Sequence, residues 1–310
     1  MFKSKAAILL SAITIISGTA LADLNNGLVS YYQFDESSGV IAHDSVGSIN
    51  GMLQGGTLFV QNEGIRGGAV KLDKATGDYI DMGDNFRFDN QSYSIQIWVK
   101  LNAHDTSYSS PVSKHWAGFQ NGYMFGVNDT SHDPNTINEY TNKAFFCASS
   151  RPCIAPSRTI VNNGDWHQIV GVYDRAKQKL LLYVDGNFQF SADSKDNISN
   201  AAPFRVGALT DFDGTTVRKT YTGYIDELRL YNRSLSRSEI QQLYRVNRPV
   251  SGNANGYANV TVTCTNKTSG KRIKFIGTNS TTSSWNCEKK GLIVKPGDKV
   301  DVLLSGTAYL

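Results

Sequence analysis

The residues between Leu209 and Gly214 have the composition of a cation-binding loop. Asp211 and Asp213 lie two positions apart, and Gly214 permits a sharp turn. Calcium prefers about six to eight oxygen ligands from carboxylates, backbone carbonyls and amide side chains. The loop therefore predicts a calcium site at Asp211 and Asp213. The alternative is an ordinary turn whose carboxylates accept hydrogen bonds from their own backbone, because the loop lacks the acid set of an EF-hand.

A second group of residues suited to binding lies between positions 104 and 146, where aromatic and amide side chains are mixed. Sugar rings have apolar faces and polar edges, which aromatic rings and Asn side chains complement. The stretch 129–142 is long, polar and unlike a strand, which is typical of binding loops. The predicted ligand-binding residues are Trp116, Phe119, Tyr140, Asn121 and Asn138. The alternative is that the aromatic residues are core positions of strands, as we expect for Tyr123, Phe125, Phe145 and Phe146.

The acidic residues form no recognisable catalytic pair. A glycosidase needs two carboxylates facing one cleft, which on a strand requires alternate positions. Asp226 and Glu227 are adjacent, so an extended strand would direct them to opposite faces. No serine-hydrolase, metalloprotease or phosphate-loop motif occurs, and the five His show no ligand spacing. We therefore expect no enzyme activity, with a polysaccharide-active enzyme as the most remote alternative.

The elements that must position these residues are mainly strands. Short β-prone runs recur at intervals of about 8–12 residues, which is typical of a β-sandwich. The run 92–101 carries its large apolar residues at every second position, so they share one face. The runs 166–174 and 179–185 predict a hairpin. The strands predicted in this part of the chain are 27–34, 68–72, 78–82, 92–101, 166–174, 179–185, 188–190, 203–208 and 224–231.

One segment has the pattern of a helix. Ser236 and Glu239 have the spacing of a capping box. Ile240, Leu243 and Tyr244 then lie on a single stripe. This predicts a short helix packed on the rim of the sandwich.

The composition changes after this helix. Residues 249–256 are rich in Asn, Gly, Pro and Ser and predict a linker. Residues 257–310 have a further β pattern, and a domain of this size benefits from a covalent staple. Its predicted strands are 260–264, 272–276, 284–287 and 292–304.

Several strand motifs carry a family resemblance. Residues 28–53 (LVSYYQFDESSGVIAHDSVGSINGML) and 223–236 (GYIDELRLYNRSLS) resemble the opening and closing strands of LamG-like jelly-roll domains. Further matches to this family are 77–83 (GDYIDMG), 93–99 (YSIQIWV), 164–174 (GDWHQIVGVYD) and 182–186 (LYVDG). The resemblance covers about residues 24–246. It implies an all-β, concanavalin A-like jelly-roll sandwich over residues 23–248, with the rim helix at its end. A small disulfide-stapled β domain then follows.

This resemblance also implies a binding module. Domains similar to laminin G and pentraxins are mostly binding modules, and many of them hold calcium. The loop of Asp211 and Asp213 falls where pentraxin-like relatives carry calcium-binding acids, and Asn121 falls near the matching position of an earlier loop. In such a fold the first and last strands are adjacent, which would bring Asp35 close to Asp226. Two such carboxylates either bind a cation or repel each other; the alternative is that they accept hydrogen bonds from loop amides.

Residues 1–22 have the pattern of a secretory signal peptide. Lys3 and Lys5 precede an apolar stretch of about 13 residues, and residues 20–22 (ALA) form a cleavage-type site. The stretch is too short for a membrane span, although a retained anchor is the alternative. We find no other long apolar segment in the sequence. We therefore expect a secreted protein, extracellular or periplasmic.

The four Cys of an exported chain favour disulfides and allow three pairings. We predict Cys147–Cys153 and Cys264–Cys287, because these pairs close the shortest loops and keep each bridge within one domain. A zinc site is the rival interpretation, but no C-x-x-C pair or cluster of His accompanies the Cys.

The net charge argues against nucleic-acid binding. Without Lys3 and Lys5, the chain has 29 Lys and Arg against 27 Asp and Glu, too small an excess for phosphate neutralisation. The C-terminal domain is locally basic, which suits an acidic partner or is simply a solvated face. Its basic residues include Lys271, Arg272, Lys274, Lys289, Lys290, Lys295 and Lys299.

These observations predict a secreted, non-catalytic binding module that recognises a glycan, assisted by Ca²⁺, at the cell surface or extracellularly. The alternative partner is a cell-surface protein. In that case the sandwich would be a spacer or an adhesin-type module, and the C-terminal domain would make the contact.

Overall fold

The computed structural model describes residues 24–310 with short gaps, together with Ile13 and Thr14. The residues outside the description are 1–12, 15–23, 104, 116–121, 129–139, 149–152, 154, 195–200, 212, 248–250, 254–256, 277–283, 289, 295–297, 299 and 309–310. Side chains are also left undescribed at 13–14, 251–253, 257–260, 284–285 and 304–308. The chain divides into two compact units, residues 26–244 and residues 245–310 with 1–25.

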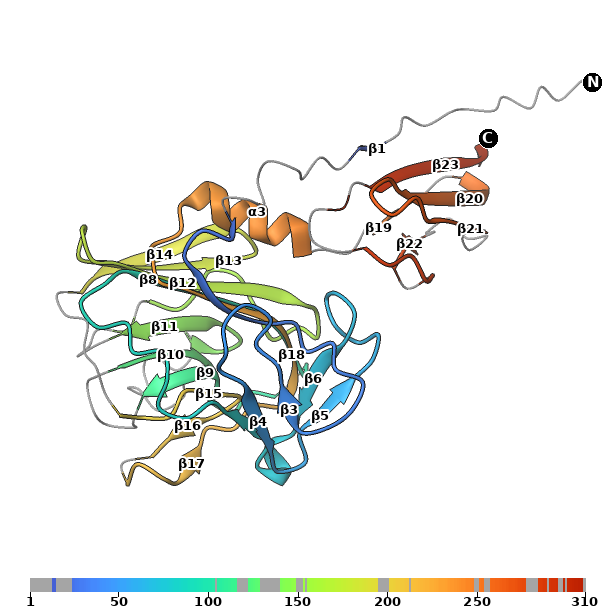
Figure 1. Ribbon diagram of the computed structural model, residues 1–310. Coiled ribbons are helices and arrows are strands. Elements are labelled where there is room, and N and C mark those ends of the chain that lie inside the picture. Colours follow the sequence, from blue (N-terminus) through green and yellow to red (C-terminus); the bar gives the residue numbers. More distant parts are fainter. Residues whose placement is uncertain are drawn as a thin grey trace, which may run out of the picture. The chain divides into compact units, whose positions relative to one another are not determined.

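Residues 26–244 form an all-β jelly-roll sandwich of two antiparallel sheets (Figure 1). The strands of the larger sheet are β2 (Leu28–Tyr32), β5 (Leu58–Val60), β6 (Ala69–Leu72), β8 (Tyr93–Leu101), β12 (His167–Asp174), β13 (Lys179–Val184), β14 (Asn187–Asp193) and β18 (Gly223–Tyr231). They follow the order β14-β13-β12-β8-β18-β6-β5, and β2 also pairs with β18. This order places the first and last strands of the sandwich side by side, as the family resemblance implies.

The strands of the smaller sheet are β3 (Ile41–Ala42), β4 (Gly51–Gln54), β7 (Tyr79–Asp81), β9 (Ser109–His115), β10 (Gly122–Val127), β11 (Ala144–Ala148) and β15 (Arg205–Val206). Their order is β11-β10-β9-β15-β7-β4-β3. A separate hairpin of β16 (Leu209–Thr210) and β17 (Val217–Arg218) follows β15. A short 3₁₀ helix, η1 (Lys74–Thr76), precedes β7.

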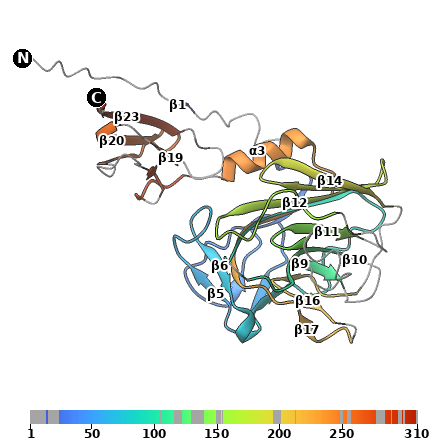
Figure 2. The ribbon, with the colours of Figure 1, turned by 180° about the vertical axis from the view of Figure 1, so that it is seen from behind.

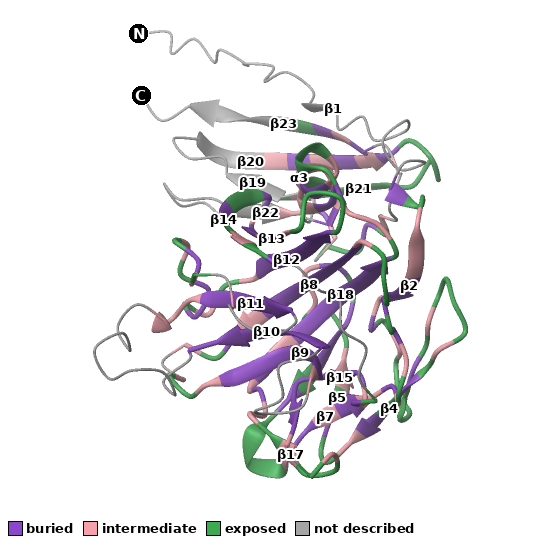
Figure 3. Ribbon diagram, turned by 90° about the vertical axis from the view of Figure 1, so that its left-hand side faces the viewer, coloured by how far each residue is buried: buried purple, intermediate pink, exposed green. Residues whose placement is uncertain are grey.

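The core lies between the inner faces of the two sheets. In β8, the alternating residues Tyr93, Ile95, Ile97 and Val99 are buried in one cluster, which confirms the predicted face. Trp98, on the opposite face of β8, is buried as well. Figure 3 shows β8, β12 and β18 buried almost throughout. The larger sheet is therefore covered on both sides, unlike a sandwich sheet with one solvated face.

The predicted helix is present as α3 (Arg237–Asn247) and covers part of the outer face of the larger sheet (Figure 2). The capping box is confirmed, because the Glu239 amide donates to the Ser236 hydroxyl (3.3 Å) and the Ser236 amide donates to the Glu239 carboxylate (2.7 Å). Ile240 is buried. The ring of Tyr244 stacks on that of Trp98, with centroids 5.5 Å apart. This stacking explains why Trp98 is buried outside the core.

The second unit contains a small four-stranded sheet in the order β1-β23-β20-β21. Its strands are β1 (Ile13–Thr14), β20 (Tyr257–Asn266), β21 (Arg272–Ile276) and β23 (Val300–Ala308), and a further pair is formed by β19 (Ser251–Asn253) and β22 (Ser284–Asn286). The predicted strand 292–304 begins only at Val300, and residues 292–294 are irregular. β19 lies within the range predicted as a linker.

Both predicted disulfides are confirmed. Cys147–Cys153 joins residues 6 positions apart beside β11, and Cys264–Cys287 joins residues 23 positions apart in the second unit. The small core of that unit is built around Cys264 and Cys287, together with Val262 and Val302. The Cys264–Cys287 disulfide therefore lies in the middle of this small core, where a covalent bond adds most to the stability of the fold.

Candidate functional site

The loop between β16 and β17 holds Asp211 and Asp213, but local groups already engage both carboxylates. Asp213 accepts hydrogen bonds from the Thr216 hydroxyl and amide (2.7 Å to the amide), and these bonds lower the pKa of Asp213 to about 2. Asp211 lies 3.2 Å from the guanidinium of Arg218. This arrangement favours the turn interpretation. Asn121, the third predicted ligand, lies outside the described residues, so calcium at this loop stays a prediction.

One predicted sugar-binding residue lies beside β10 and β11 of the smaller sheet. Of the five, only Tyr140 belongs to the described part of the chain. Its ring is half-buried and packs edge-on against Phe145, with centroids 5.6 Å apart. The residues outside the description are Trp116, Phe119, Asn121 and Asn138. Tyr123, Phe125, Phe145 and Phe146 are buried, as the core alternative predicts for them.

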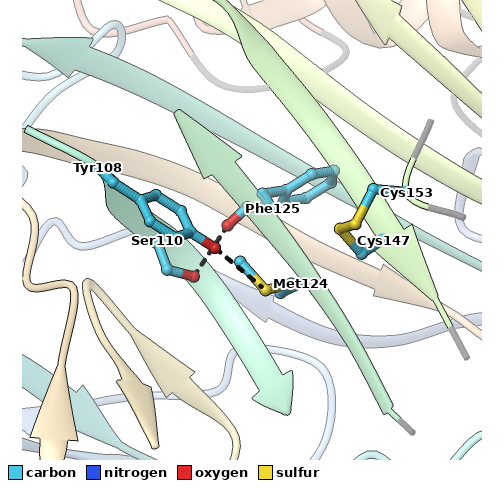
Figure 4. Close-up of a disulfide and its surroundings, with 6 residues drawn as sticks. All are labelled: Tyr108, Ser110, Met124, Phe125, Cys147 and Cys153. Carbon is cyan, nitrogen blue, oxygen red and sulfur yellow. Dashed lines mark hydrogen bonds between the residues drawn. A yellow bond between two sulfur atoms is a disulfide. The ribbon is translucent and has the colours of Figure 1, made fainter. Parts of the chain in front are cut away.

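A satellite apolar cluster anchors this region on the outer face of the smaller sheet. It contains Met124 of β10 and Cys147 of β11, with Tyr108 and Tyr140 packed against it. Figure 4 shows the hydroxyl of Tyr108 directed at the sulfur of Met124 (3.8 Å), with the Cys147–Cys153 bridge nearby. Of the predicted ligand-binding residues, the cluster holds Tyr140, and the bridge lies at its edge.

His115 is a residue of this region that the sequence did not single out. It ends β9, directly before the undescribed stretch 116–121. In the part of the chain that the structure describes, its Nδ1 atom is buried without a hydrogen-bond partner. Burial lowers the pKa of His115 to about 4, so the ring is neutral at physiological pH. A neutral imidazole beside a predicted binding loop can donate or accept one hydrogen bond to a ligand.

Asp35 and Asp226 meet at the loop 64–68, as the resemblance implies. Asp35 follows β2, which pairs antiparallel with β18. The Gly68 amide donates to Asp35 (2.6 Å), and the Arg66 amide donates to Asp226 (3.2 Å). Both carboxylates therefore bind the same short loop.

The prediction that Asp226 and Glu227 point to opposite faces is wrong. The register of β18 against β8 shifts between Asp226 and Arg229, and Glu227 has a φ of 54°, which marks a β-bulge. Asp226 lies opposite Trp98 on the outer face. Glu227 accepts a hydrogen bond from the Tyr31 hydroxyl (2.8 Å) and pairs with Arg229 (2.6 Å) on that same side. The extra residue of the bulge brings the two acids together.

The acidic cluster, defined as Asp35, Asp226 and Glu227, is neutralised in part, because Arg229 pairs with Glu227 and the positive charge of Arg66 acts on Asp35. Asp226 is 0% exposed, and both hydrogen bonds that it accepts come from main-chain amides. Burial raises the pKa of Asp226 well above its usual range, and the nearby charges of Glu227 and Asp35 act in the same direction. Burial also raises the pKa of Asp35. Burial therefore favours the protonated form of Asp226.

The loop 64–68 supplies carbonyl oxygens next to Asp226. A Cβ atom placed on Gly64 would lie 1.8 Å from the Gly68 carbonyl oxygen, 2.5 Å from that of Arg66 and 2.7 Å from the Asp226 carboxylate. Oxygens of these kinds are the ligands that calcium prefers. No three Asp, Glu, His or Cys side chains of the described residues are grouped to hold a metal ion. A calcium ion bound here would therefore be held by Asp35 and Asp226 together with carbonyl oxygens of the loop 64–68. The residues present fit that role.

Asp35 and Asp226 are predicted together from the sequence, whereas the approach of Glu227 and of the loop 64–68 to them is not. The available signal was the string GIRGG at 64–68, since three Gly in five residues indicate a place where other chain atoms approach the backbone closely. The acidic cluster does not resemble a glycosidase site, because Asp226 and Glu227 are both buried and cannot reach a substrate.

Comparisons with known proteins agree with the fold. The sequence pattern of the concanavalin A-like lectin/glucanases superfamily matches residues 74–241. No curated protein matches the sequence. Domain 4 of AbnA, a GH43 extracellular arabinanase from Geobacillus stearothermophilus in complex with arabinotriose, is 22% identical, with a TM-score of 0.49 over 70% of this chain and 98% of the domain.

Two toxin structures are similar at lower identity. The binding domain of Paraclostridial Mosquitocidal Protein 1 is 16% identical, with a TM-score of 0.55 over 81% of this chain and 64% of the other. Botulinum neurotoxin type C, whose cell entry depends on interaction with two ganglioside molecules, is 14% identical, with a TM-score of 0.53 over 79% and 58%. This chain thus spans less than two thirds of either toxin structure. The match to the superfamily covers more than half of the chain and coincides with the two-sheet jelly roll, so the protein belongs to the concanavalin A-like lectin/glucanases superfamily.

Proposed function

We propose that the protein is a secreted, non-catalytic lectin that binds a glycan through the loops at the β11 end of the smaller sheet. The observation that carries this proposal is the packing of Tyr140 against an apolar cluster that contains Met124 and Cys147 of the Cys147–Cys153 bridge, with Tyr108 beside it. Such packing restricts the ring of Tyr140, which lowers the entropic cost of binding a sugar. The same fold serves a toxin whose cell entry depends on gangliosides.

Secretion is supported by two disulfides and by the signal-peptide pattern of residues 1–22. No helix among the described residues is long and apolar enough to cross a membrane. The absence of catalysis is supported by the burial of Asp226 and Glu227, the one adjacent acid pair on a central strand.

Calcium has a structural role in this proposal. It would be held by Asp35, Asp226 and the carbonyls of loop 64–68, and it would neutralise a carboxylate that the fold buries. The ion would then tie β2 and β18 to the loop before β6. The Asp211 loop is the second candidate position for the ion.

A glycan array with the chain from residue 23 onward tests the binding function. Signal for a defined glycan class that is lost in Tyr140→Ala and Trp116→Ala supports the proposed site. Tyr224→Ala is the matched control, since Tyr224 is an equally half-exposed tyrosine on the larger sheet. A blank array with calcium and with EDTA would reject the lectin function in favour of a protein partner. Release of reducing ends from a bound polysaccharide would reject the absence of catalysis.

A further inference from the structure

The charge of the protein is divided unevenly along the chain. Residues 257–310 contain eight Lys and Arg and three Asp and Glu, a net charge of +5. Residues 23–256 contain 21 Lys and Arg and 24 Asp and Glu, a net charge of −3. A small domain with such an excess attracts polyanions from a distance. The question is whether its surface offers them a place to bind.

The central strand of the four-stranded sheet has two chemically different faces. Val262 and Cys264 of β20 point into the small core. Thr261, Thr263 and Thr265 alternate with them and therefore lie on the opposite face, where all three are partly exposed. Hydroxyl groups are thus repeated along this face at every second residue, about 7 Å apart.

The neighbouring strand β21 places positive charges beside this stripe. Directly opposed residues of antiparallel strands share a face. The register puts Arg272 opposite Thr265 and Lys274 opposite Thr263. Arg272 and Lys274 are both exposed. We call these five residues, Thr261, Thr263, Thr265, Arg272 and Lys274, the threonine face.

Apolar side chains flank the threonine face on both sides. Ile276 lies opposite Thr261 and is 72% exposed, and Leu303 of β23 lies opposite Thr263 and is 42% exposed. Asp301 is the one acid that the described register places on this face, and it is paired with Lys267 at 3.1 Å. The face therefore combines hydroxyls, cations and apolar groups, with its single carboxylate already neutralised.

We propose that the threonine face is a second binding surface, separate from the site of the sandwich, and that it binds an acidic polysaccharide. The Arg272 and Lys274 side chains would pair with uronate or sulfate groups. The threonine hydroxyls would exchange hydrogen bonds with sugar hydroxyls, and Ile276 and Leu303 would contact the apolar sides of the rings. A single-stranded nucleic acid fits less well, because such strands bind by stacking their bases on aromatic rings. The described side chains of this face include no aromatic ring.

The test measures binding of the chain from residue 23 onward to immobilised heparin and polygalacturonate. We expect both polymers to bind, with an affinity that falls as salt is added. The double substitution Arg272→Gln/Lys274→Gln should weaken binding about tenfold, since each exposed ion pair contributes up to about 1 kcal/mol. The control Lys71→Gln/Arg175→Gln removes the same charge from exposed positions of the sandwich and should leave the affinity unchanged within about twofold.

Several outcomes would overturn the proposal. These are absence of binding by the parent protein, equal losses in the two double variants, and binding of polyglutamate or duplex DNA as tight as that of the polysaccharides. The charge-preserving variant Arg272→Lys/Lys274→Arg should bind within about threefold of the parent. If it fails to bind although its thermal unfolding is unchanged, charge on this face is not what recognises the polymer. Loss of neutral-glycan binding in Tyr140→Ala tests the sandwich site and leaves this result unaffected.

Discussion

At the scale of single residues, the acidic cluster is the feature with the largest consequences. A buried carboxylate without a cationic partner is unfavourable, and the fold keeps Asp226 in that position with only two amide donors. In the proposed calcium site a bound cation would remove this cost, and metal binding would then be coupled to stability.

This coupling gives a prediction for Asp226→Asn. For the parent protein, calcium at about a hundred times its dissociation constant should stabilise the fold by about 3 kcal/mol, which raises Tm by roughly 5–10 °C. Asp226→Asn should lose this rise, because the neutral amide supplies less charge to the ion. Thermal unfolding in calcium and in EDTA measures the effect. Asp211→Asn is the control and should keep the rise; if it abolishes the rise instead, the ion binds at the β16–β17 loop.

The ion pair of Asp84 and Lys114 gives a prediction about pH. The Lys114 ammonium is almost fully buried and lies 2.8 Å from Asp84, which also pairs with Arg87. These bonds lower the pKa of Asp84 from 3.8 to about 2. Because the folded-state pKa is depressed, the stabilisation is present above about pH 4 and disappears as the pH falls through about 2.

The substitution Asp84→Asn should therefore destabilise the protein at neutral pH by about 1 kcal/mol, after allowance for the partial exposure of Asp84. The difference from the parent should shrink toward zero as the pH approaches about 2. Urea unfolding of both proteins across this range is the measurement. If the difference in the free energy of unfolding stays constant with pH, protonation of Asp84 does not remove the stabilising bonds, and the prediction is wrong.

At the scale of elements, α3 shows how local and tertiary signals combine. The capping box fixes where the helix begins, and the apolar stripe fixes which side faces the sheet. The stacking of Tyr244 on Trp98 then buries a residue that alternation alone would place in solvent. Gly186 lies beneath the helix, where a Cβ would approach Tyr244 to 3.2 Å.

We predict that Ser236→Ala destabilises the sandwich by about 1 kcal/mol, because the Glu239 amide loses its hydrogen-bond acceptor. Ser238→Ala is the control, since Ser238 is equally exposed and its hydroxyl contacts that of Ser236 (3.0 Å), but the Glu239 amide donates to Ser236. Denaturant unfolding should separate the two variants. Equal stabilities would mean that packing of α3 on the sheet, and not its cap, determines whether the helix forms.

At the scale of the whole molecule, the two disulfides serve different purposes. Cys147–Cys153 closes a short loop beside the smaller sheet of the sandwich, whereas Cys264–Cys287 joins residues 23 positions apart within a small core. Loop-closure entropy assigns about 2 kcal/mol to the first and about 3 kcal/mol to the second. A unit as small as the second has little stability beyond that amount.

Replacing both Cys264 and Cys287 by Ser should therefore unfold the second unit and leave the sandwich folded. Limited proteolysis should remove the C-terminal part of the chain and leave a resistant fragment. Replacing Cys147 and Cys153 should leave both units folded and impair glycan binding instead, because this bridge belongs to the cluster on which Tyr140 packs. Equal resistance of the two double variants to proteolysis would contradict the division of roles.

The sequence by itself determined the features that depend on short-range order. Alternation in 92–101, the hairpin at 166–185, the capping box at Ser236 and the shortest disulfide pairing are local patterns, and each is present in the structure. The jelly-roll motifs also implied that the first and last strands of the sandwich are adjacent, and the structure pairs β2 with β18. These features are predictable because residues near in sequence constrain one another directly.

Only the tertiary structure decided the acidic cluster. The bulge at Glu227 directs Asp226 and Glu227 to the same side of the strand. The sequence IDEL contains no pattern that predicts a bulge. The meeting of loop 64–68 with Asp226 joins residues that lie 160 positions apart. Gly171 is a similar case, since a Cβ there would lie 2.8 Å from Phe125 and Phe146 of the facing sheet. Such contacts depend on how the sheets stack and where a strand gains an extra residue, and those are properties of the packed molecule rather than of any local pattern.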